Sequence, residues 1–484
     1  MKRFFNKAFI VAAMSSMMAA SCDSNNMDTG ENTGQSVSVS FAPDTESNLK
    51  NPYMGWTLYS EGGQNTDRPE PYWYMQDEAA EKYAGVFYIR WRWSDLEPEE
   101  GKYAWEHNED FKGLVQGALD RNLRLAFRIY VNGRDNLKPA TPQYVLDGAE
   151  TYTVAPGHQT PYPDDEFFLE KYIKFIEAFG KKYNDPAIVD YVDSYGLGFW
   201  GEEHNITYKD PLKKYDTHDR IVRAYEKAFD KVINVINFGV RDATQEAVVY
   251  DELGFTSRRD GYVSSYFPVS QQKELVKRFP ATPIIAEACY WGGTGISTVE
   301  GGKYPSWGEY YDAVVAQSIE THANYLDLRT PTEASRYLSS ALDAVKLFVS
   351  KGGYRIYPTT VGYEITAGTL TVSHSWKNLG VGVLPNNNVH LRYKYKIMFG
   401  LFDENDKLVK SFESKTVEVS ELVGGEVFSG EDAFALDGIP SGKYKLAAGI
   451  VNTIPNDSKD IALAVKNPKK ISGEWIYVSD LNIQ

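Results

Sequence analysis

Short apolar and aromatic runs alternate with longer amphipathic stretches from residue 50 to residue 350, and this alternation limits the possible folds more than any other feature of the chain. Eight runs have the length and composition of buried strands: residues 53–59, 85–93, 123–131, 189–200, 234–240, 261–267, 283–291 and 324–328. Alternating strands and helices predict parallel strands joined by helical crossovers, and eight such units predict a closed (β/α)8 barrel. The alternative is an open doubly wound sheet, which usually carries a glycine-rich phosphate loop after its first strand, and this sequence has none there.

The period of the sequence changes after about residue 352. Apolar residues occupy every second position from Leu391 to Leu401, with basic residues between them at 392, 394 and 396, and a period of two is typical of a half-buried strand. Similar stretches follow or precede it at residues 369–376, 443–451 and 474–483. We therefore expect a (β/α)8 TIM barrel over residues 49–351, followed by an all-β sandwich domain over residues 352–484.

The N-terminus has the pattern of an export signal. Residues 1–21 join a basic start to the apolar stretch "AFIVAAMSSMMAA", which is too short to span a bilayer comfortably. The stretch leads into "AASC", which resembles the lipobox of bacterial lipoproteins and implies that Cys22 becomes the lipidated first residue. The polar segment that follows predicts a flexible tether over residues 22–48. The alternative is an ordinary secretory signal with an unrelated cysteine.

An exported lipoprotein of the cell envelope is therefore expected, in the outer membrane on its periplasmic or surface face. Its only contact with the membrane would be the lipid anchor at Cys22. The chain has two cysteines, and the other is Cys289. An acylated Cys22 would leave Cys289 without a partner for an internal disulfide.

Composition narrows the class of partner. The formal net charge is −15 and no cluster of Lys and Arg stands out, so nucleic acid is not expected as a partner. The 34 Tyr and 10 Trp suit a large core, and they also suit open clefts that hold carbohydrate. No HExxH, paired CxxC, EF-hand or GxSxG pattern occurs, so we expect neither a metal nor another cofactor.

Two glutamates stand where a (β/α)8 barrel carries its active site, at the C-terminal ends of the strands. The fourth predicted strand leads into "GLGFWGEEHN" with Glu202, and the seventh contains "IIAEACYW" with Glu287. Glycoside hydrolysis requires two carboxyl groups across one scissile bond, one to donate a proton and one to attack or to activate water. Structural alternatives exist: Glu202 could cap the next segment or pair with an arginine, and Glu287 could belong to a buried ion pair.

The segment "RWRWSDLEPEEGKYAW" (residues 90–105) resembles the strand-two region of clan A glycoside hydrolases. "NPYMGW", "GFWGEEH" and "SHSWKNLGVGVLP" resemble segments of bacterial lipoprotein glycoside hydrolases that have a barrel and a C-terminal β-sandwich. The resemblance implies that Glu202 is the acid/base and Glu287 the nucleophile, and that Tyr266 hydrogen-bonds the nucleophile. Gly201 departs from the clan A pattern, which has there an asparagine that binds the sugar 2-hydroxyl. That contact must therefore come from elsewhere.

Several further residues are candidates for substrate binding. Arg90 and Arg92 alternate onto one face of the second strand, and Arg128 lies near the end of the third. A nearby guanidinium group keeps a nucleophilic carboxylate ionised, although these arginines could instead form barrel ion pairs. His204 and Asn205 could hydrogen-bond sugar hydroxyls.

Tryptophans and the second glutamate complete the set of candidates. Trp200, Trp291 and Trp307 could stack on pyranose rings, with core packing as the alternative. Glu203 is expected to be a solvated acid of the rim that helps Glu202 to keep its proton. Glu97 is expected to shape a loop.

The sequence therefore predicts a glycoside hydrolase that acts on an oligo- or polysaccharide, with a retaining double displacement as the expected mechanism. A non-catalytic surface glycan-binding lipoprotein on the same barrel is the alternative, since it would keep the aromatic side chains without needing both glutamates. A structural scaffold with a functional sandwich domain is a third possibility.

Overall fold

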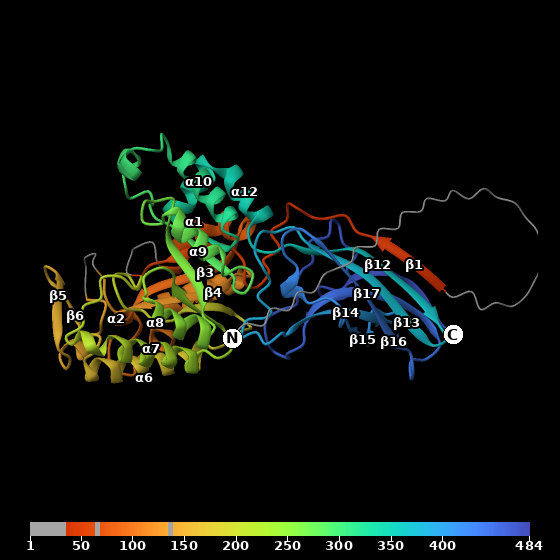
Figure 1. Cartoon of the computed structure of the whole chain (residues 1–484), viewed down its shortest axis with the longest axis horizontal. Helices are drawn as coiled ribbons and strands as arrows, with labels where there is room; N and C mark the ends of the chain where they lie inside the picture. Colours follow the sequence, from red (N-terminus) through yellow and green to blue (C-terminus); the bar gives the residue numbers. More distant parts are fainter. Residues whose placement is uncertain (1–34, 63–67, 134–138) are drawn as a thin grey trace, which may run out of the picture. The chain divides into compact units, whose positions relative to one another are not determined.

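The computed structural model describes residues 35–62, 68–133 and 139–484 (Figure 1). The predicted signal peptide and Cys22 lie outside the described residues. Within the described chain, no helix is both long and apolar enough to cross a membrane.

Eight parallel strands form a closed barrel, which confirms the predicted fold and excludes the open sheet. In order around the barrel they are β2 (Gly55–Ser60), β3 (Ala84–Arg92), β4 (Arg124–Tyr130), β7 (Val189–Asp193), β8 (Ile233–Asn237), β9 (Thr256–Tyr262), β10 (Ile284–Ala288) and β11 (Ala323–Arg329). The sixth strand was predicted wrongly, because β9 ends where residues 261–267 were expected to begin their run. The fourth is shorter than predicted, so Glu202 lies in the loop that follows β7.

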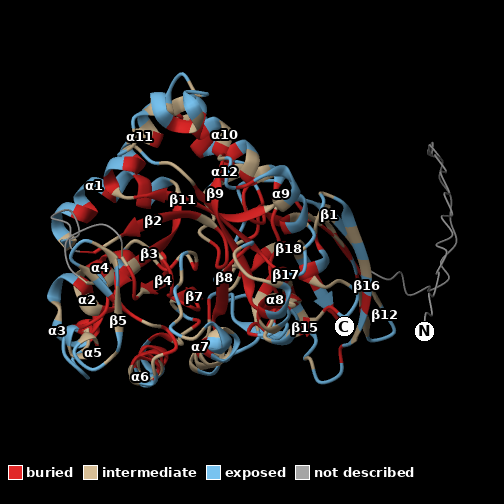
Figure 2. Ribbon diagram, turned by 60° about the vertical axis from the view of Figure 1, so that its left-hand side comes forward, coloured by how far each residue is buried: buried red, intermediate tan, exposed pale blue. Residues whose placement is uncertain are grey.

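Helices surround the barrel, with their outer faces exposed and the strands buried (Figure 2). The helices are α1 (Pro69–Lys82), α2 (Trp93–Leu96), α3 (Ala104–His107), α4 (Glu109–Asp120), α5 (Gln143–Leu146), α6 (Glu166–Tyr183), η2 (Pro211–Lys213), α7 (Lys214–Ala228), α8 (Ala243–Glu246), η3 (Ala247–Glu252), α9 (Val269–Val276), η4 (Ile296–Gly301), α10 (Trp307–Glu320), α11 (Pro331–Ser340) and α12 (Leu342–Lys351). The short strands β5 (Thr151–Ala155) and β6 (His158–Pro161) form a hairpin in the loop before α6. The sequence of α6 explains its position: Asp165 caps its first turn by accepting from the Phe168 backbone N–H at 2.9 Å, and its apolar stripe is buried.

The C-terminal domain consists of two four-stranded antiparallel sheets. One has the order β1 (Gln35–Ser40), β12 (Ile356–Thr366), β13 (Thr369–Asn378) and β16 (Val427–Ala435). The other has the order β15 (Leu408–Glu413), β14 (Tyr395–Phe402), β17 (Gly442–Asn452) and β18 (Ile476–Ile483), with the short helix η5 (Val419–Glu421) between β15 and β16. Residues 35–40 were predicted to belong to the flexible tether; instead they form β1, which pairs with β12 from Gln35↔Ile365 to Ser40↔Thr360.

Barrel and sandwich share buried contacts. One apolar cluster contains Tyr191 and Tyr325 from the barrel interior together with Tyr354 and Tyr395 from the sandwich side. Asn324 on β11 donates both amide hydrogens across this junction, to the backbone oxygens of Tyr53 at 2.8 Å and Val383 at 2.7 Å. The closed lower end of the barrel is thus packed, which leaves the C-terminal end of the strands for the site.

Candidate active site

A cavity of about 980 Å³ opens at the C-terminal ends of the barrel strands. Its wall includes the residues predicted for the site from the sequence except Arg128 and Trp307: Arg90, Arg92, Trp200, Glu202, His204, Asn205, Tyr266, Glu287 and Trp291. Trp307 begins α10 and packs against Tyr310 and Tyr311, away from the cavity. Arg128 lies directly beneath, with its side chain only 1% exposed, and contacts both glutamates. Counting strands in the sequence predicted that Glu202 and Glu287 lie at the same end of the barrel, and both line this one cavity.

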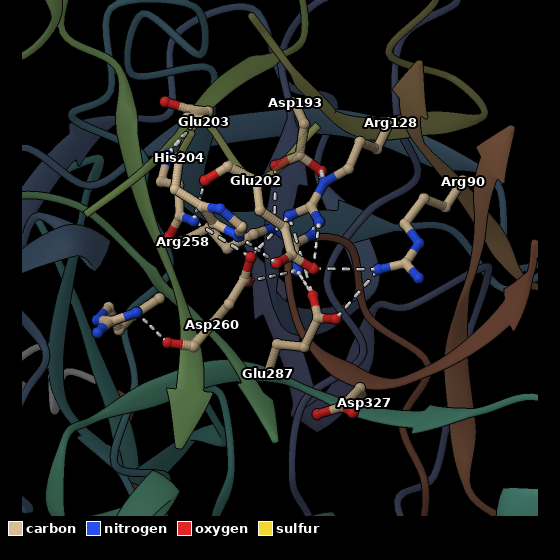
Figure 3. Close-up of polar contacts among 12 residues, drawn as sticks. Arg90, Arg128, Asp193, Glu202, Glu203, His204, Arg258, Asp260, Glu287 and Asp327 are labelled. Atoms are coloured by element: carbon tan, nitrogen blue, oxygen red, sulfur yellow. Dashed lines mark hydrogen bonds and ion pairs between the residues drawn. The ribbon is translucent and has the colours of Figure 1, made fainter. Parts of the chain in front are cut away.

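Glu287 projects from β10 into a ring of arginines (Figure 3). Its side chain is 4% exposed, and its oxygens lie 2.9 Å from Arg258 Nη1, 3.5 Å from Arg329 Nη2, 3.6 Å from Arg90 Nη1 and 3.9 Å from Arg128 Nη2. Burial alone would raise the pKa of Glu287, but the four guanidinium groups outweigh burial and hold its pKa well below its usual range. The arginines therefore favour the ionised form of Glu287.

Glu202 approaches from the loop after β7 and is 18% exposed. One oxygen lies 3.4 Å from Arg90 Nη1 and 3.8 Å from Arg128 Nη1, and the other lies 3.2 Å from His204 Nε2. Asn205 Nδ2 lies 2.6 Å from His204 Nδ1. With Nδ1 accepting from the asparagine amide, the ring hydrogen is on Nε2, which donates to Glu202.

The backbone of this loop explains why two adjacent glutamates face opposite ways. Trp200, Gly201, Glu203 and Asn205 all have positive φ, at 54°, 74°, 69° and 57°. Positive φ at residues other than glycine is uncommon and clusters at functional sites. A Cβ atom at Gly201 would stand 3.0 Å from the Cβ of Tyr130, so the residue expected there in clan A cannot fit without displacing β4 side chains.

Glu203 was expected from the sequence to be a solvated acid of the rim, and this expectation is wrong. Its side chain is 4% exposed rather than solvated, it pairs with the buried Arg241, and it accepts from the Asn237 backbone N–H at 2.8 Å. Figure 3 shows Glu203 directed away from the Glu202 carboxyl group. Glu203 therefore fixes the loop to the neighbouring strand.

Arg90 connects the two candidate catalytic carboxylates. A single nitrogen, Nη1, lies 3.4 Å from Glu202 Oε1 and 3.6 Å from Glu287 Oε1, while Nη2 lies 2.7 Å from Glu61 Oε1. The two contacts to Nη1 limit the separation of these glutamate oxygens to about 7 Å. Arg92 also lines the cavity, but its guanidinium group pairs with Asp95 at 2.6 Å.

The aromatic candidates differ in exposure. Tyr266 is 71% exposed and Trp291 is 44% exposed, and both line the cavity, whereas Trp200 is half-buried and packs against Phe199 and His204. Within the described residues no hydrogen bond joins Tyr266 to Glu287, contrary to what the resemblance implies. The reason is that β9 ends at Tyr262, so Tyr266 lies on the loop beyond the strand.

Several charged residues of the site were not predicted from the sequence, above all Arg258 and Asp260. Both lie on β9, and their spacing of two places them on the same inward face as a strand requires. The signal was present in "TSRRDGY" but was not recognised, because the strand was placed five residues too late. Glu61, Asp193, Asp327 and Arg329 were also missed, and each contacts at least one of the arginines or carboxylates described above.

Two of these acids have raised pKa values. Burial, and then the negative charge of Glu287, raise the pKa of Asp260 to about 8. Burial and Glu287 also raise the pKa of Asp327 to about 6, although Arg329 opposes the shift. The described residues contain no cluster of His, Cys, Asp and Glu arranged to hold a metal ion.

No protein-family model matches the chain, and no curated protein sequence matches it significantly. Solved structures do match its fold. The exo-β-1,4-mannosidase Op5Man5 from Opitutaceae bacterium strain TAV5 is 14% identical with a TM-score of 0.39, over 61% of this chain and 55% of the mannosidase. Endo-glycoceramidase II from Rhodococcus sp. is 12% identical with a TM-score of 0.40, over 81% of this chain and 99% of that chain. The catalytic domain of β-amylase from Paenibacillus polymyxa is 8% identical with a TM-score of 0.42, over 61% and 99%.

The match spans only about half of the mannosidase. Similarity at these identities and TM-scores carries no argument about activity. The function is therefore inferred from the chain's own site.

Proposed function

We propose that this protein is a glycoside hydrolase that cleaves its carbohydrate substrate by a retaining double displacement. One observation carries the proposal: Glu202 and Glu287 meet at the same nitrogen of Arg90, inside a cavity at the C-terminal end of a (β/α)8 barrel. Their nearest oxygens are at most about 7 Å apart. This limit allows the ~5–5.5 Å separation of the carboxyl groups in retaining enzymes.

The electrostatics suit different tasks for the two groups. Glu287 is held ionised by four arginines, which suits a nucleophile that attacks the anomeric carbon. Glu202, on the opposite side of Arg90, would give a proton to the departing oxygen and later take one from the attacking water. His204 would keep the Glu202 carboxyl in position through its Nε2 hydrogen.

The first experiment measures hydrolysis of a panel of aryl glycosides and of plant and host glycans. Glu287→Gln should abolish activity on whichever substrate the wild-type protein cleaves, since the nucleophile is lost. Glu97→Gln is the matched control. Glu97 is buried and accepts from Trp93 Nε1, Tyr144 Oη and the Gly101 N–H, outside the cavity. Activity in Glu287→Gln equal to that of the control would refute the proposal.

The second experiment separates the two roles. Glu202→Ala should still form a glycosyl-enzyme with an activated aryl glycoside, and azide should restore its turnover. A 2-fluoro glycoside should label the peptide that contains Glu287, and NMR should show a product of retained anomeric configuration. An inverted product, or a label on another peptide, would contradict the assignment.

A glycan-binding protein without catalysis is the second candidate, and the exposed Tyr266 and Trp291 at the cavity favour it. Such a protein would bind the glycans of the panel without cleaving any of them. In that case Glu287→Gln would leave binding intact, whereas replacement of Trp291 by alanine would weaken it.

We also propose that Cys22 is lipidated and anchors the protein in the cell envelope. The support is the "AASC" sequence after a basic and then apolar start. Labelled palmitate should enter the wild-type protein and not Cys22→Ala. Equal labelling of both, or of neither, would exclude the anchor.

A further inference from the structure

Asp260 is a third carboxyl group of the cavity, and the mechanism above gives it no task. It lies on β9 in register with Glu287 on β10, so the two acids are neighbours on adjacent parallel strands. Figure 3 shows that the carboxyl groups of Glu202, Asp260 and Glu287 converge. Asp260 also lines the cavity.

Asp260 has few contacts that would stabilise its carboxyl group in the negatively charged form. Its Oδ2 accepts from Asn237 Nδ2 at 3.2 Å and from Arg128 Nη2 at 3.4 Å. Its Oδ1 has no hydrogen-bond partner among the described residues, and Arg258 Nη1 is 4.0 Å away. The same Arg258 nitrogen lies 2.9 Å from Glu287, so Glu287 has the stronger ion pair.

Adjacent buried carboxyls of this kind do not all ionise together, because each charge disfavours the next. The charged groups that face Asp260 are Arg128 from β4, Glu202 from the loop after β7, Arg258 and Arg259 from β9, and Glu287 from β10. Glu287 takes the negative charge, and burial together with that charge raises the pKa of Asp260 to about 8.

We propose that Asp260 carries the proton of the resting site and passes it to Glu202 when substrate is bound. The inference rests on the proposed function. In the transfer the O–H bond of Asp260 breaks as an O–H bond forms on Glu202, so the total charge of the pair does not change. After water attacks the glycosyl-enzyme, its proton goes to Glu202, and the reverse transfer restores Asp260.

Arg128 places the two groups within reach. Its Nη1 lies 3.8 Å from Glu202 and its Nη2 lies 3.4 Å from Asp260, so one guanidinium group holds both carboxyls side by side. Proton transfer between them requires hydrogen-bond contact or one bridging water. The arrangement keeps an acid available near pH 8, where an isolated glutamic acid with a pKa of about 4.3 would be ionised.

The test uses Asp260→Asn, which keeps the shape of the side chain but has no acidic proton. Two aryl glycosides of the sugar found in the panel are compared, one with a good and one with a poor leaving group. The variant should lose roughly 10²-fold in kcat/KM on the poor leaving group, which needs a proton, and change little on the good one. Asp164→Asn is the control, because Asp164 is buried outside the cavity and accepts from the backbone of Lys209 and Asp210. An equal loss on both substrates, or no loss on either, would overturn the proposal.

The pH profile gives a second readout. On the poor leaving group, wild-type kcat/KM should fall as the pH rises through about 8, and the fall should begin at lower pH in Asp260→Asn. An unchanged alkaline limb would overturn the proposal.

The third readout is thermal stability, which does not depend on any substrate. An aspartate in the unfolded chain has a pKa of about 3.9, so between about pH 4 and pH 8 the folded state alone keeps the Asp260 proton. The stability of the wild-type protein therefore falls across this window by an amount that Asp260→Asn does not share. The Tm of the variant relative to wild type should rise from about pH 5 to about pH 8, and a constant difference would overturn the proposal. If the Tm difference depends on pH but Glu287→Gln is still active, the proposed glycosidase mechanism is wrong, while the conclusion that Asp260 is protonated stands.

Discussion

Glu202 and Glu203 are adjacent in sequence, yet one lines the cavity and the other is buried behind it. The difference comes from the positive φ of Gly201 and Glu203, which turns successive side chains in opposite directions. The sequence predicted that glutamates follow the fourth strand, but it did not reveal the backbone turn that directs their side chains in opposite directions. For the same reason, the expectation that Glu203 was solvated is wrong.

The buried pair of Glu203 and Arg241 leads to the first prediction. Both side chains are 4% exposed, so Glu203→Ala leaves Arg241 buried without its partner. Such a loss typically costs about 3–5 kcal/mol of unfolding free energy, measurable by urea denaturation. The double variant Glu203→Ala with Arg241→Met should recover part of that loss. A single variant as stable as wild type would mean that the pair contributes nothing.

Gly201 gives the second prediction. Gly201→Asn introduces the asparagine that the clan A pattern has at this place, yet it should lower activity, because its Cβ would stand 3.0 Å from Tyr130 and 3.2 Å from Arg128. Strain at a positive-φ residue costs on the order of 1–3 kcal/mol, and the displacement would move Glu202 as well. Gly157→Asn is the matched control, since Gly157 also has positive φ but has open space around its Cβ position. Higher activity in Gly201→Asn would contradict the geometry.

At the scale of elements, strand β9 supplies Arg258, the arginine closest to Glu287 at 2.9 Å. Burial would raise the pKa of Glu287 and the guanidinium groups lower it, so Arg258→Met should allow its pKa to rise. A nucleophile must be ionised, so the acid limb of kcat/KM should move to higher pH in this variant. Arg258→Lys retains a positive charge and should move it less. A limb at the same pH in wild type and Arg258→Met would exclude Glu287 as the group that titrates.

Most helices and strands were predictable, because burying one face of an element places apolar residues at a regular spacing in the sequence. The barrel strands are apolar and short, and counting them placed Glu202 and Glu287 correctly at one end of the barrel. Strand β9 was misplaced because its inward positions hold Arg258 and Asp260, which a hydrophobic pattern does not reveal. Strand β1 was missed although "SVSVS" alternates, because its partner β12 is more than 300 residues away in the sequence.

Strand β1 gives the prediction at this scale. It covers one edge of β12 over six residue pairs, so removing residues 1–41 should expose that edge, lower the Tm and promote aggregation. A truncation that removes only residues 1–34 is the control and should unfold like the full chain. Thermal melting followed by circular dichroism and light scattering separates the two, and equal behaviour would mean that β1 adds no stability.

At the scale of the whole molecule, the junction of barrel and sandwich determines how the protein unfolds. One buried cluster extends from Tyr191 and Tyr325 inside the barrel to Tyr354 and Tyr395 of the sandwich side, so neither part can expose its half without losing contacts of the other. We therefore expect a single cooperative transition, in which the calorimetric and van't Hoff enthalpies agree.

Asn324 is the residue with which to test this coupling. It donates to Tyr53 and to Val383, so Asn324→Ala leaves two buried carbonyl oxygens without these donors, at a cost of about 1–3 kcal/mol each. The Tm of the whole chain should fall while the transition stays single, because barrel and sandwich still share the apolar cluster. Ser373→Ala, on an exposed face of β13, should leave the Tm close to that of wild type. Two separate transitions in the wild-type protein would show that barrel and sandwich unfold independently, and the shared cluster would then contribute little to stability.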